Sequence, residues 1–342
     1  MRILVTGGAG FIGSHLVRRL VADGHERVVN LDALRYSGNL ENLADVADNP
    51  RYLFVHADIC DGDTVEKILR DQAIEAAINC AAETHVDRSI LDPNSFAKTD
   101  VVGTGVLLEA ARKIKVTRFL QVSTDEVYGS VERGSSKEDD QLEPRSPYSA
   151  SKAGGDLLVR SYWTTYGFPV LITRGSNTYG PNQYPEKFIP LFTTNALDDQ
   201  PLPLYGDGRQ RRDWLSVYDH CGAILHVLHH GESGTVYNVG GGNERENITV
   251  AQAILDHLGK PKSLIRYVED RQGHDWRYAV DSNRLRALGW APTVRFEEGL
   301  RATVDWYRGH EGWWRKIKSG EFRAYYEQTY GERLRKALGG MG

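Results

Sequence analysis

Two pairs of side chains near the middle of the sequence have the types and spacing for redox and acid/base chemistry. Asp125 and Glu126 follow closely after an apolar run, Phe119 to Val122, that is typical of a buried strand. Charged side chains are rarely buried unless they are paired or used. Tyr148 and Lys152 have the spacing that places two side chains on one face of a helix. We predict that the Tyr/Lys pair serves a hydride transfer, to which the two carboxylates add acid/base catalysis.

Each pair also has a simpler explanation. A tyrosine hydroxyl has a pKa of about 10, which is too high for a base at neutral pH, and a nearby ammonium group or cationic cofactor lowers it. A Tyr and a Lys one helical turn apart also occur by chance. For the carboxylates the alternative is equally open at this point: Asp125 would cap a helix and Glu126 would be solvated.

A glycine-rich loop at the start of the chain gives the Tyr/Lys pair its context. Arg2 to Thr6 reads as a short strand and Ser14 to Asp23 as an amphipathic helix. Between them, Gly7 allows a tight turn, Gly10 lets the backbone approach a pyrophosphate, and Gly13 allows the helix to pack closely on the strand. The free N–H groups of the helix start favour phosphate binding. The order strand, loop, helix therefore predicts a dinucleotide site.

The choice between the two nicotinamide dinucleotides depends on Asp32. It ends the next expected strand, Val28 to Leu31, at about the distance from the glycine loop where an acidic residue accepts hydrogen bonds from the adenosine ribose. A carboxylate there also repels a 2′-phosphate, so NAD is preferred to NADP. Arg35 is a reason for caution, because a nearby arginine can accommodate that phosphate.

Strand and helix signals alternate through the first half of the chain. We expect strands at Tyr52 to His56, Ala76 to Cys80 and Phe119 to Val122, and helices at Gly62 to Asp71, at Pro93 to Lys113 and from Pro147 onward. Such alternation implies parallel strands with right-handed crossovers. The predicted fold class is α/β: a Rossmann-type doubly wound parallel sheet with a smaller, interleaved α/β substrate domain.

The pattern changes after the expected strand Val170 to Thr173. Gly175 to Pro181 is loop-like, Phe188 to Leu197 reads as a helix, and Leu202 to Tyr205 with Arg209 to Trp214 suggests a short hairpin. We place the dinucleotide-binding domain at residues 1–178 plus about 215–240, and the substrate domain at 179–214 plus about 241–330. Residues 331–342 would be a tail, with Gly339 to Gly342 disordered.

Composition narrows the class of protein further. The 342 residues are 40% hydrophobic and 26% charged, with a net charge of −4 and both signs mixed throughout, which disfavours a nucleic-acid or membrane surface. The three cysteines (Cys60, Cys80, Cys221) favour a reducing compartment over a disulfide framework. No Cys/His spacing predicts a metal site. We see no signal peptide and no apolar run of about 20 residues, so we expect a cytoplasmic protein.

Taken together, the motifs resemble those of the extended short-chain dehydrogenases/reductases, and within them the dTDP-glucose 4,6-dehydratase family. The resemblance extends from Arg2 to about Lys316. The glycine loop and Tyr148-x-x-x-Lys152 indicate only the superfamily. Six further segments also match: Asp32 to Asn39, Ala82 to Ser89, Thr124-Asp125-Glu126, Asn177 to Pro181, Pro185 to Lys187, and Gly273 to Tyr278. Of these, the Thr-Asp-Glu tripeptide and the two C-terminal motifs are much more specific.

The resemblance implies a set of site residues. The catalytic residues would be Thr124, Asp125, Glu126, Tyr148 and Lys152. NAD would bind at Gly7, Gly10, Phe11, Ile12, Gly13, Asp32, Leu34, Ser37, Gly38, Asp58, Ile59, Ala81, Ala82, Thr99, Ser123, Tyr148 and Lys152. The nucleotide-sugar would bind at Thr84, Asn177, Glu186, Lys187, Pro203, Tyr205, Arg212, Asn247, Arg271, His274 and Tyr278. An exposed-surface position stays open for Arg212 and for His274. A homodimer is expected from the resemblance alone.

The implied reaction is dehydration of a nucleotide-diphospho-glucose to the 4-keto-6-deoxy sugar. The sugar would be oxidised at C4, would lose water across C5 and C6 with Glu126 as base and Asp125 as acid, and would take the hydride back at C6. A nucleotide-sugar 4-epimerase would need Tyr148, Lys152 and NAD but not the two carboxylates. A decarboxylase would want a cation for a uronic carboxylate, and we see no clear candidate. A non-catalytic nucleotide-sugar-binding module is the alternative from another class of protein.

Overall fold

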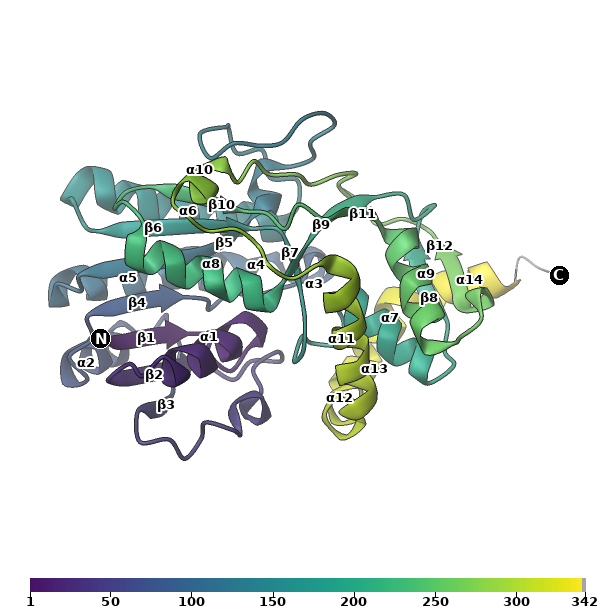
Figure 1. Cartoon of the computed structure of the whole chain (residues 1–342), viewed down its shortest axis with the longest axis horizontal. Helices are drawn as coiled ribbons and strands as arrows, with labels where there is room; N and C mark the ends of the chain where they lie inside the picture. Colours follow the sequence, from purple (N-terminus) through teal and green to yellow (C-terminus); the bar gives the residue numbers. More distant parts are fainter. Residues whose placement is uncertain (340–342) are drawn as a thin grey trace.

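The structure is a computed structural model that describes residues 1–339, and it contains two packed units side by side along the long axis of the molecule (Figure 1). The disordered tail was expected at Gly339 to Gly342. Gly339 is instead the last residue of helix α14 (Glu332–Gly339), and residues 340–342 lie outside the described part of the chain.

The first unit is built on a seven-stranded sheet in the order β10-β6-β5-β4-β1-β2-β3. Its strands are β1 (Arg2–Thr6), β2 (Arg27–Asp32), β3 (Tyr52–His56), β4 (Ala76–Asn79), β5 (Arg118–Thr124), β6 (Val170–Gly175) and β10 (Val236–Val239). Every neighbouring pair is parallel, so all the strands end at the same edge of the sheet. The strand order reverses between β1 and β4, which makes this the switch point where doubly wound sheets bind ligands. The predicted Rossmann-type sheet is confirmed.

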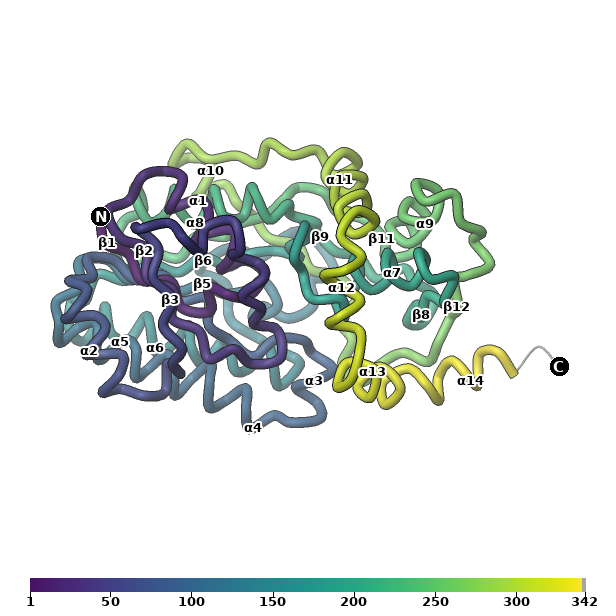
Figure 2. The backbone as a smooth tube through the Cα atoms, turned by 90° about the horizontal axis from the view of Figure 1, so that it is seen from below, coloured from purple at the N-terminus to yellow at the C-terminus, as the bar shows by residue number. Residues whose placement is uncertain are grey.

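Helices cover both faces of this sheet (Figure 2). One face carries α1 (Phe11–Ala22) and α8 (Val217–His230), and the other carries α2 (Gly62–Asp71), α5 (Thr104–Ile114) and α6 (Pro147–Tyr166). Two apolar clusters fill the space between the layers, one on each side of the sheet. Strands buried on both faces are expected to be apolar throughout, and this explains why the strand signals were continuous runs rather than alternations.

The stretch Pro93 to Lys113 is not the single helix that was predicted. It divides into α4 (Pro93–Phe96), a π-helical turn η2 (Ala97–Gly103) and α5. The wider turn brings the buried carboxylate of Asp100 within 2.6 Å of the Ser151 hydroxyl on α6. A π-turn inserts one residue without breaking the helical pattern, so periodicity alone does not reveal it.

The second unit contains two small sheets and most of the C-terminal helices. The strands are β7 (Asn177–Tyr179), β9 (Arg211–Ser216) and β11 (Glu244–Glu246) in one sheet, and β8 (Leu202–Tyr205) and β12 (Ile265–Val268) in the other. Its helices include α7 (Phe188–Leu197), α9 (Asn247–Leu258), α11 (Phe296–Gly309), α12 (Glu311–Ile317) and α13 (Glu321–Tyr326). Short helices elsewhere in the chain include η1 (Leu40–Leu43), α3 (Val86–Leu91), η3 (Asp125–Tyr128), η4 (Lys262–Leu264) and α10 (Asn283–Ala287).

Two predictions for this unit are wrong. β8 does not form a hairpin with the strand after it, because β8 pairs in parallel with β12 while β9 pairs with β7 and β11. The chain between β8 and β9 turns through two glycines with positive φ, Gly206 and Gly208, which mimics a hairpin signal in the sequence. The segment expected to be a loop, Gly175 to Pro181, contains β7, whose three residues are too few to show a strand pattern.

The C-terminal residues from 331 onward, predicted to be a tail, continue as a packed helix up to Gly339. The π-helical turn η5 (Glu327–Gly331) and α14 place Tyr330 and Leu334 in the apolar cluster of the second unit. The limits of the two domains stay a prediction. Within residues 1–339, no helix is both long and apolar enough to cross a membrane. The same described residues contain no group of three or more His, Cys, Asp or Glu side chains placed to hold a metal ion.

Candidate active site

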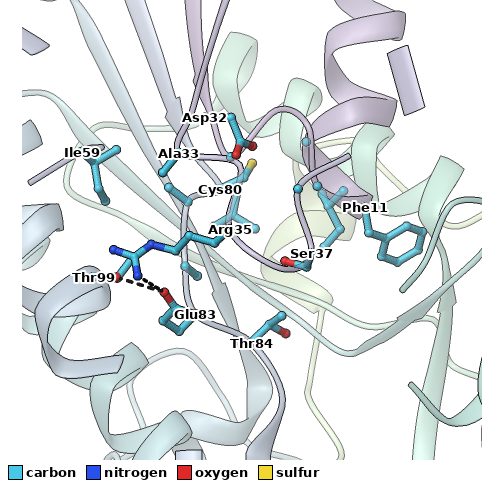
Figure 3. A pocket seen from close by; sticks show the side chains of 18 of the residues that line it. Phe11, Asp32, Ala33, Arg35, Ser37, Ile59, Cys80, Glu83, Thr84 and Thr99 are labelled. Atoms are coloured by element: carbon cyan, nitrogen blue, oxygen red, sulfur yellow. Dashed lines mark hydrogen bonds and ion pairs between the residues drawn. The ribbon is translucent and has the colours of Figure 1, made fainter. Parts of the chain in front are cut away.

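The glycine loop borders a cavity at the switch point of the sheet (Figure 3). Gly7 has φ +66°, and a Cβ there would lie 2.8 Å from the backbone of Ala81. A Cβ on Gly13 would collide with the carbonyl oxygen of Gly7, so only glycine lets α1 approach this closely. α1 begins at Phe11, earlier than the predicted Ser14, and the residues of its first turn border the cavity. Helices leave the N–H groups of this turn without internal partners, and such groups suit a pyrophosphate.

Asp32 ends β2 at the rim of this cavity, as the sequence predicted. Its two carboxylate oxygens accept hydrogen bonds from the backbone N–H groups of Ala9 (2.9 Å) and Leu34 (2.7 Å). These bonds fix the carboxylate, and each oxygen keeps a second lone pair for a ribose hydroxyl. The site therefore fits the adenosine end of a dinucleotide.

Arg35 is the side chain that could have attracted a 2′-phosphate, and two carboxylates engage it. Its guanidinium lies 2.9 Å from Asp58 and 3.2 Å from Glu83, and the latter pair is visible in Figure 3. Thr99 donates a hydrogen bond of 3.4 Å to the same oxygen of Glu83. Because its charge is already compensated, this arginine offers an added phosphate little attraction. The geometry favours an unphosphorylated ribose.

Most residues predicted to bind the cofactor line this one cavity. They are Gly7, Gly10, Phe11, Ile12, Gly13, Asp32, Ser37, Gly38, Asp58, Ile59, Ala81, Ala82, Thr99, Ser123, Tyr148 and Lys152. Leu34 is not among the lining residues; it contributes its N–H to Asp32 instead. The sequence analysis missed Gln183 and Tyr184, which also line the cavity. Both lie between the motifs Asn177 to Pro181 and Pro185 to Lys187, and only this position in the sequence could have indicated a role at the site.

The two predicted catalytic carboxylates lie at the end of β5. The strand extends past Val122 to Thr124, whose hydroxyl caps the short turn η3 by accepting a hydrogen bond of 3.3 Å from the Glu126 N–H. Asp125 is only 3% exposed and its Oδ2 has no hydrogen-bond partner. Glu126 lines a second cavity. The alternative is therefore wrong for Asp125, because Thr124 provides the cap, while Glu126 is half-buried and faces the second cavity.

The surroundings affect the two carboxylates differently. Burial, followed by the negative charges of Glu126 and Asp213, raises the pKa of Asp125 well above its usual value. Burial also raises the pKa of Glu126, but three cations counter this increase: Arg271, Lys187 and Arg212. Asp125 is thus the member of the pair that keeps its proton, and Glu126 is the one whose anion is supported. This is the division of roles that an acid and a base at one site require.

Tyr148 and Lys152 lie on α6, which starts at Pro147 as predicted and is capped by Ser146. The Lys152 ammonium donates a hydrogen bond of 3.0 Å to the carbonyl of Val122. The pKa of Tyr148 is raised well above its usual value by burial, then by Glu126 and Asp100. This net shift is opposite to the lowering expected from Lys152. The protein by itself therefore holds the phenol in its protonated form.

The second cavity is lined by ten of the eleven residues predicted to bind substrate. They are Asn177, Glu186, Lys187, Pro203, Tyr205, Arg212, Asn247, Arg271, His274 and Tyr278. The eleventh, Thr84, lines the cofactor cavity instead. Lys187 lines both cavities, so they meet at this side chain. Three titratable lining residues were among those missed: His85 and Asp87, which lie in a motif quoted for another reason, and Tyr330, which lies at the edge of the expected tail.

This second cavity carries charges of both signs and is incompletely hydrogen-bonded. Its lining includes Lys187, Arg212 and Arg271 as well as Asp87, Glu126 and Glu186. Arg212 is only 5% exposed and contacts His274 at 3.0 Å, so neither is a surface residue. Burial and the neighbouring cations Arg271 and Arg212 lower the pKa of His274 to about 3, which keeps it neutral. The buried atoms Asn177 Oδ1, Asn247 Oδ1 and Arg271 Nε have no hydrogen-bond partner. Such atoms are costly unless a polar ligand satisfies them: the two amide oxygens would accept hydrogen bonds from ligand hydroxyl or N–H groups, and the Arg271 Nε–H would donate to an anionic group.

Comparison with known proteins agrees with this geometry. The family model described as GDP-mannose 4,6 dehydratase matches residues 4–303. The dTDP-glucose 4,6-dehydratase of Streptomyces niveus is 50% identical over 325 residues, covering 93% of this chain and 96% of that protein.

Solved structures give the same result. DesIV, a dTDP-glucose 4,6-dehydratase from Streptomyces venezuelae solved with NAD and dTDP bound, superimposes with a TM-score of 0.91 at 51% identity, covering 93% of this chain and all of that one. A UDP-glucose 4-epimerase from Thermus thermophilus in complex with NAD has a TM-score of 0.84 at 35% identity, covering 91% of this chain and all of that one. The chain belongs to the dTDP-glucose 4,6-dehydratase family of the extended short-chain dehydrogenases/reductases.

Proposed function

We propose that this protein is an NAD-dependent hydro-lyase that converts dTDP-glucose to dTDP-4-keto-6-deoxyglucose. The observation that carries the proposal is the position of the adjacent carboxyl groups of Asp125 and Glu126. Asp125 is buried and Glu126 lines the second cavity, and both lie close enough to Tyr148, which lines the cofactor cavity, to affect its pKa. The dehydratase relatives, at about 50% identity over nearly the whole chain, support the same substrate.

Each side chain has a defined task in this reaction. Tyr148 takes the proton of the C4 hydroxyl, and Thr124 hydrogen-bonds the C4 oxygen. Bound NAD supplies an acceptor for the C4 hydride and later returns the same hydride to C6. The ketone at C4 acidifies the C5 proton, which Glu126 removes while Asp125 protonates the departing C6 hydroxyl. Glu126 then gives its proton back to C5, and general acid/base help of this kind is worth about 10²–10⁴-fold.

The proton balance of this scheme closes. The substrate loses the C6 hydroxyl and the proton of the C4 hydroxyl, which together make one water. After the reaction Tyr148 carries one proton more and Asp125 one proton fewer. One proton must therefore pass from Tyr148 to Asp125, directly or through solvent, before the next turnover. Tyr148 must therefore begin each turnover as the phenolate, a form that the Lys152 ammonium group and the positive charge of bound NAD would favour. The raised pKa of Asp125 favours the protonated form that the acid needs.

The structural likeness to a UDP-glucose 4-epimerase makes epimerisation the alternative reaction. An epimerase needs a base at C4 and a nicotinamide, but no acid and base at C5 and C6. Burying Asp125 and Glu126 side by side is costly, and without elimination chemistry nothing would offset that cost. For a non-catalytic module, the retention of both Tyr148 and Lys152 would have no explanation.

Incubating the purified protein with dTDP-glucose and no added NAD tests the proposed function. The cofactor is regenerated in each turnover and is expected to stay bound, so water loss should proceed and NAD should be found in the preparation. The product is identified by mass and by its 4-keto group. Conversion to dTDP-galactose would show that the enzyme is an epimerase. Binding of dTDP-glucose without any turnover would point to the non-catalytic module.

We also propose that the protein is a cytoplasmic homodimer. The three cysteines are free, which suits a reducing compartment. Three large apolar side chains on η2 and α6 are more than half exposed: Val102 (56%), Leu157 (56%) and Tyr166 (55%). Large exposed apolar side chains on neighbouring helices are typical of a subunit interface.

Replacing Leu157 by glutamate is expected to convert a dimer into a monomer, because a charge would be buried without a partner at the interface. Sedimentation velocity at micromolar concentration measures the change. Tyr267→Glu is the matched control, because Tyr267 is 54% exposed on the second unit, away from α6. A dimer that persists in Leu157→Glu, or a wild-type protein that sediments as a monomer, contradicts this proposal.

A further inference from the structure

A guanidinium that the proposed mechanism does not use lies at the centre of a cage beside the two cavities. Arg88, on α3, pairs with Glu186 at 2.7 Å, and the Glu186 side chain is fully buried. The guanidinium carbon also lies 3.7 Å from the ring centre of Tyr36 and 4.1 Å from that of Tyr325. We call Tyr36, Arg88, Glu186 and Tyr325 the Arg88 cage. Planar stacking between two rings with a third contact to a carboxylate is a geometry that arginine meets and lysine does not.

The cage joins segments that are distant in the sequence. Tyr36 belongs to the loop after β2, whose neighbours Arg35 and Ser37 line the cofactor cavity. Tyr325 comes from the C-terminal helix α13, which Figure 2 shows on the lower side of the second unit, beside α3. The Tyr325 hydroxyl also lies 3.0 Å from Nδ1 of His85, within hydrogen-bond distance. One guanidinium thus connects the loop over the cofactor, the substrate cavity and the C-terminal helices.

The carboxylate of Glu186 is held on both oxygens. Oε2 receives the Nε–H of Arg88, and Oε1 lies 2.7 Å from the Tyr36 hydroxyl. That hydroxyl also lies 2.8 Å from the carbonyl oxygen of Thr84, and its single proton can serve only one of the two acceptors at a time. The sequence analysis expected Glu186 to contact substrate. In the structure its principal contacts are to the cage.

The position of Glu186 determines where Lys187 lies. Lys187 is the next residue, it precedes the first turn of α7, and it is the side chain at which the two cavities meet. Its ammonium group is close enough to Glu126 to support the Glu126 anion. A shift of Glu186 would therefore move a cation that faces the catalytic base.

We propose that Arg88 is a positioning residue for the dehydration: through Glu186 it holds Lys187 against the reacting end of the sugar. This inference rests on the proposed function. Arg88 acts at the sugar end of the substrate cavity and not on the nucleotide. Its loss leaves a buried carboxylate without its main partner, and Glu186 would then move or take up a proton.

The test compares Arg88→Met and Arg88→Lys in the full-length, NAD-loaded enzyme. For Arg88→Met we expect kcat/KM for dTDP-glucose to fall by at least about tenfold, while the Kd of dTDP, which has no sugar, changes by less than about twofold. Arg88→Lys should recover part of the loss, because the charge returns without the stacking. Calorimetric titration with dTDP gives the Kd independently of activity.

Three further variants control for a simple loss of folding. Tyr325→Leu removes one wall of the cage from a helix outside the cavities and should lower kcat/KM in the same direction, whereas Tyr325→Phe keeps the ring and should not. Arg315→Met is the matched control: Arg315 stacks 4.3 Å from the Trp314 ring and pairs with Asp198 at 2.7 Å, but lines neither cavity.

The outcomes separate the two proposals. A wild-type enzyme that does not dehydrate dTDP-glucose overturns the proposed function, whatever the variants do. A wild-type enzyme that dehydrates, with an Arg88→Met variant no worse than Arg315→Met, overturns the positioning role. The positioning role is also overturned if Arg88→Met loses dTDP affinity and kcat/KM in equal measure, because that pattern indicates general damage to the fold.

Discussion

Replacing Glu126 by glutamine is expected to lower kcat for water loss by about 10²–10⁴-fold, the usual contribution of a general base, without loss of bound NAD. Glutamine has nearly the same shape but cannot accept the C5 proton. Glu126 lines the substrate cavity, not the cofactor cavity, so NAD binding should not change. Oxidation at C4 depends on Tyr148 and should still occur. Enzyme mixed with dTDP-glucose should therefore show the absorbance of the reduced nicotinamide without dehydrated product.

The matched control for this variant is Glu132→Gln. Glu132 is an exposed glutamate that follows the same turn a few residues later. It should retain wild-type kcat, because its charge is solvated and it lines neither cavity. Unchanged water loss in Glu126→Gln would show that another group removes the C5 proton, and Asp125 would then have to serve as both acid and base.

Replacing Tyr148 by phenylalanine is expected to stop the reaction one step earlier, again with a loss of about 10²–10⁴-fold in kcat. Phenylalanine keeps the ring, which packs edge-to-face against Phe96 with centroids 6.2 Å apart, but has no oxygen to take the C4 proton. Neither reduced nicotinamide nor product should accumulate. Stopped-flow absorbance distinguishes this variant from Glu126→Gln, in which reduced nicotinamide does appear.

Tyr218→Phe is the control for the loss of a hydroxyl, because Tyr218 is 59% exposed on α8 and lines neither cavity. A Tyr148→Phe variant that still reduces its nicotinamide at the wild-type rate would mean that the C4 proton leaves by another route. Tyr148, whose pKa is raised by burial, would then have a structural role and not a catalytic one.

The parallel sheet and its ligand edge could be predicted from the sequence because local signals agreed with the global fold. The glycines of the first loop, the acidic Asp32 at a strand end and the apolar strand before Asp125 are each typical of a parallel α/β sheet. The structure places all three at the carboxyl edge of the sheet. Pro147 fixed the start of α6 for a similar reason, because proline is favoured in the first turn of a helix.

The features that sequence reasoning missed depend on contacts between distant segments. Nothing in the sequence near Leu202 shows that β8 pairs with β12, which comes about sixty residues later, while the two nearby glycines suggested a hairpin. The π-turn around Asp100 leaves helical periodicity intact. Glu186 lines the substrate cavity, but its bonds to Arg88 and Tyr36 could not be predicted because those residues lie far away along the chain.

The pKa of Tyr148 was predicted to be lowered by Lys152 together with a cationic nicotinamide, and for the cofactor-bound enzyme this stays a prediction. In the protein alone, burial, followed by the carboxylates of Glu126 and Asp100, raises the pKa of Tyr148. The balance between burial and several charges depends on depth and distance, neither of which is visible in the spacing of two residues.

The most direct test of the central claim is the fate of the hydrogen at C4. One bound nicotinamide is expected to take this hydride and return it to C6 of the same sugar while Asp125 and Glu126 expel water. With dTDP-glucose carrying deuterium at C4, we predict that the label appears at C6 of the 4-keto-6-deoxy product, as measured by NMR and mass spectrometry. Deuterium found in the solvent, or still at C4 of an epimerised sugar, would contradict the claim.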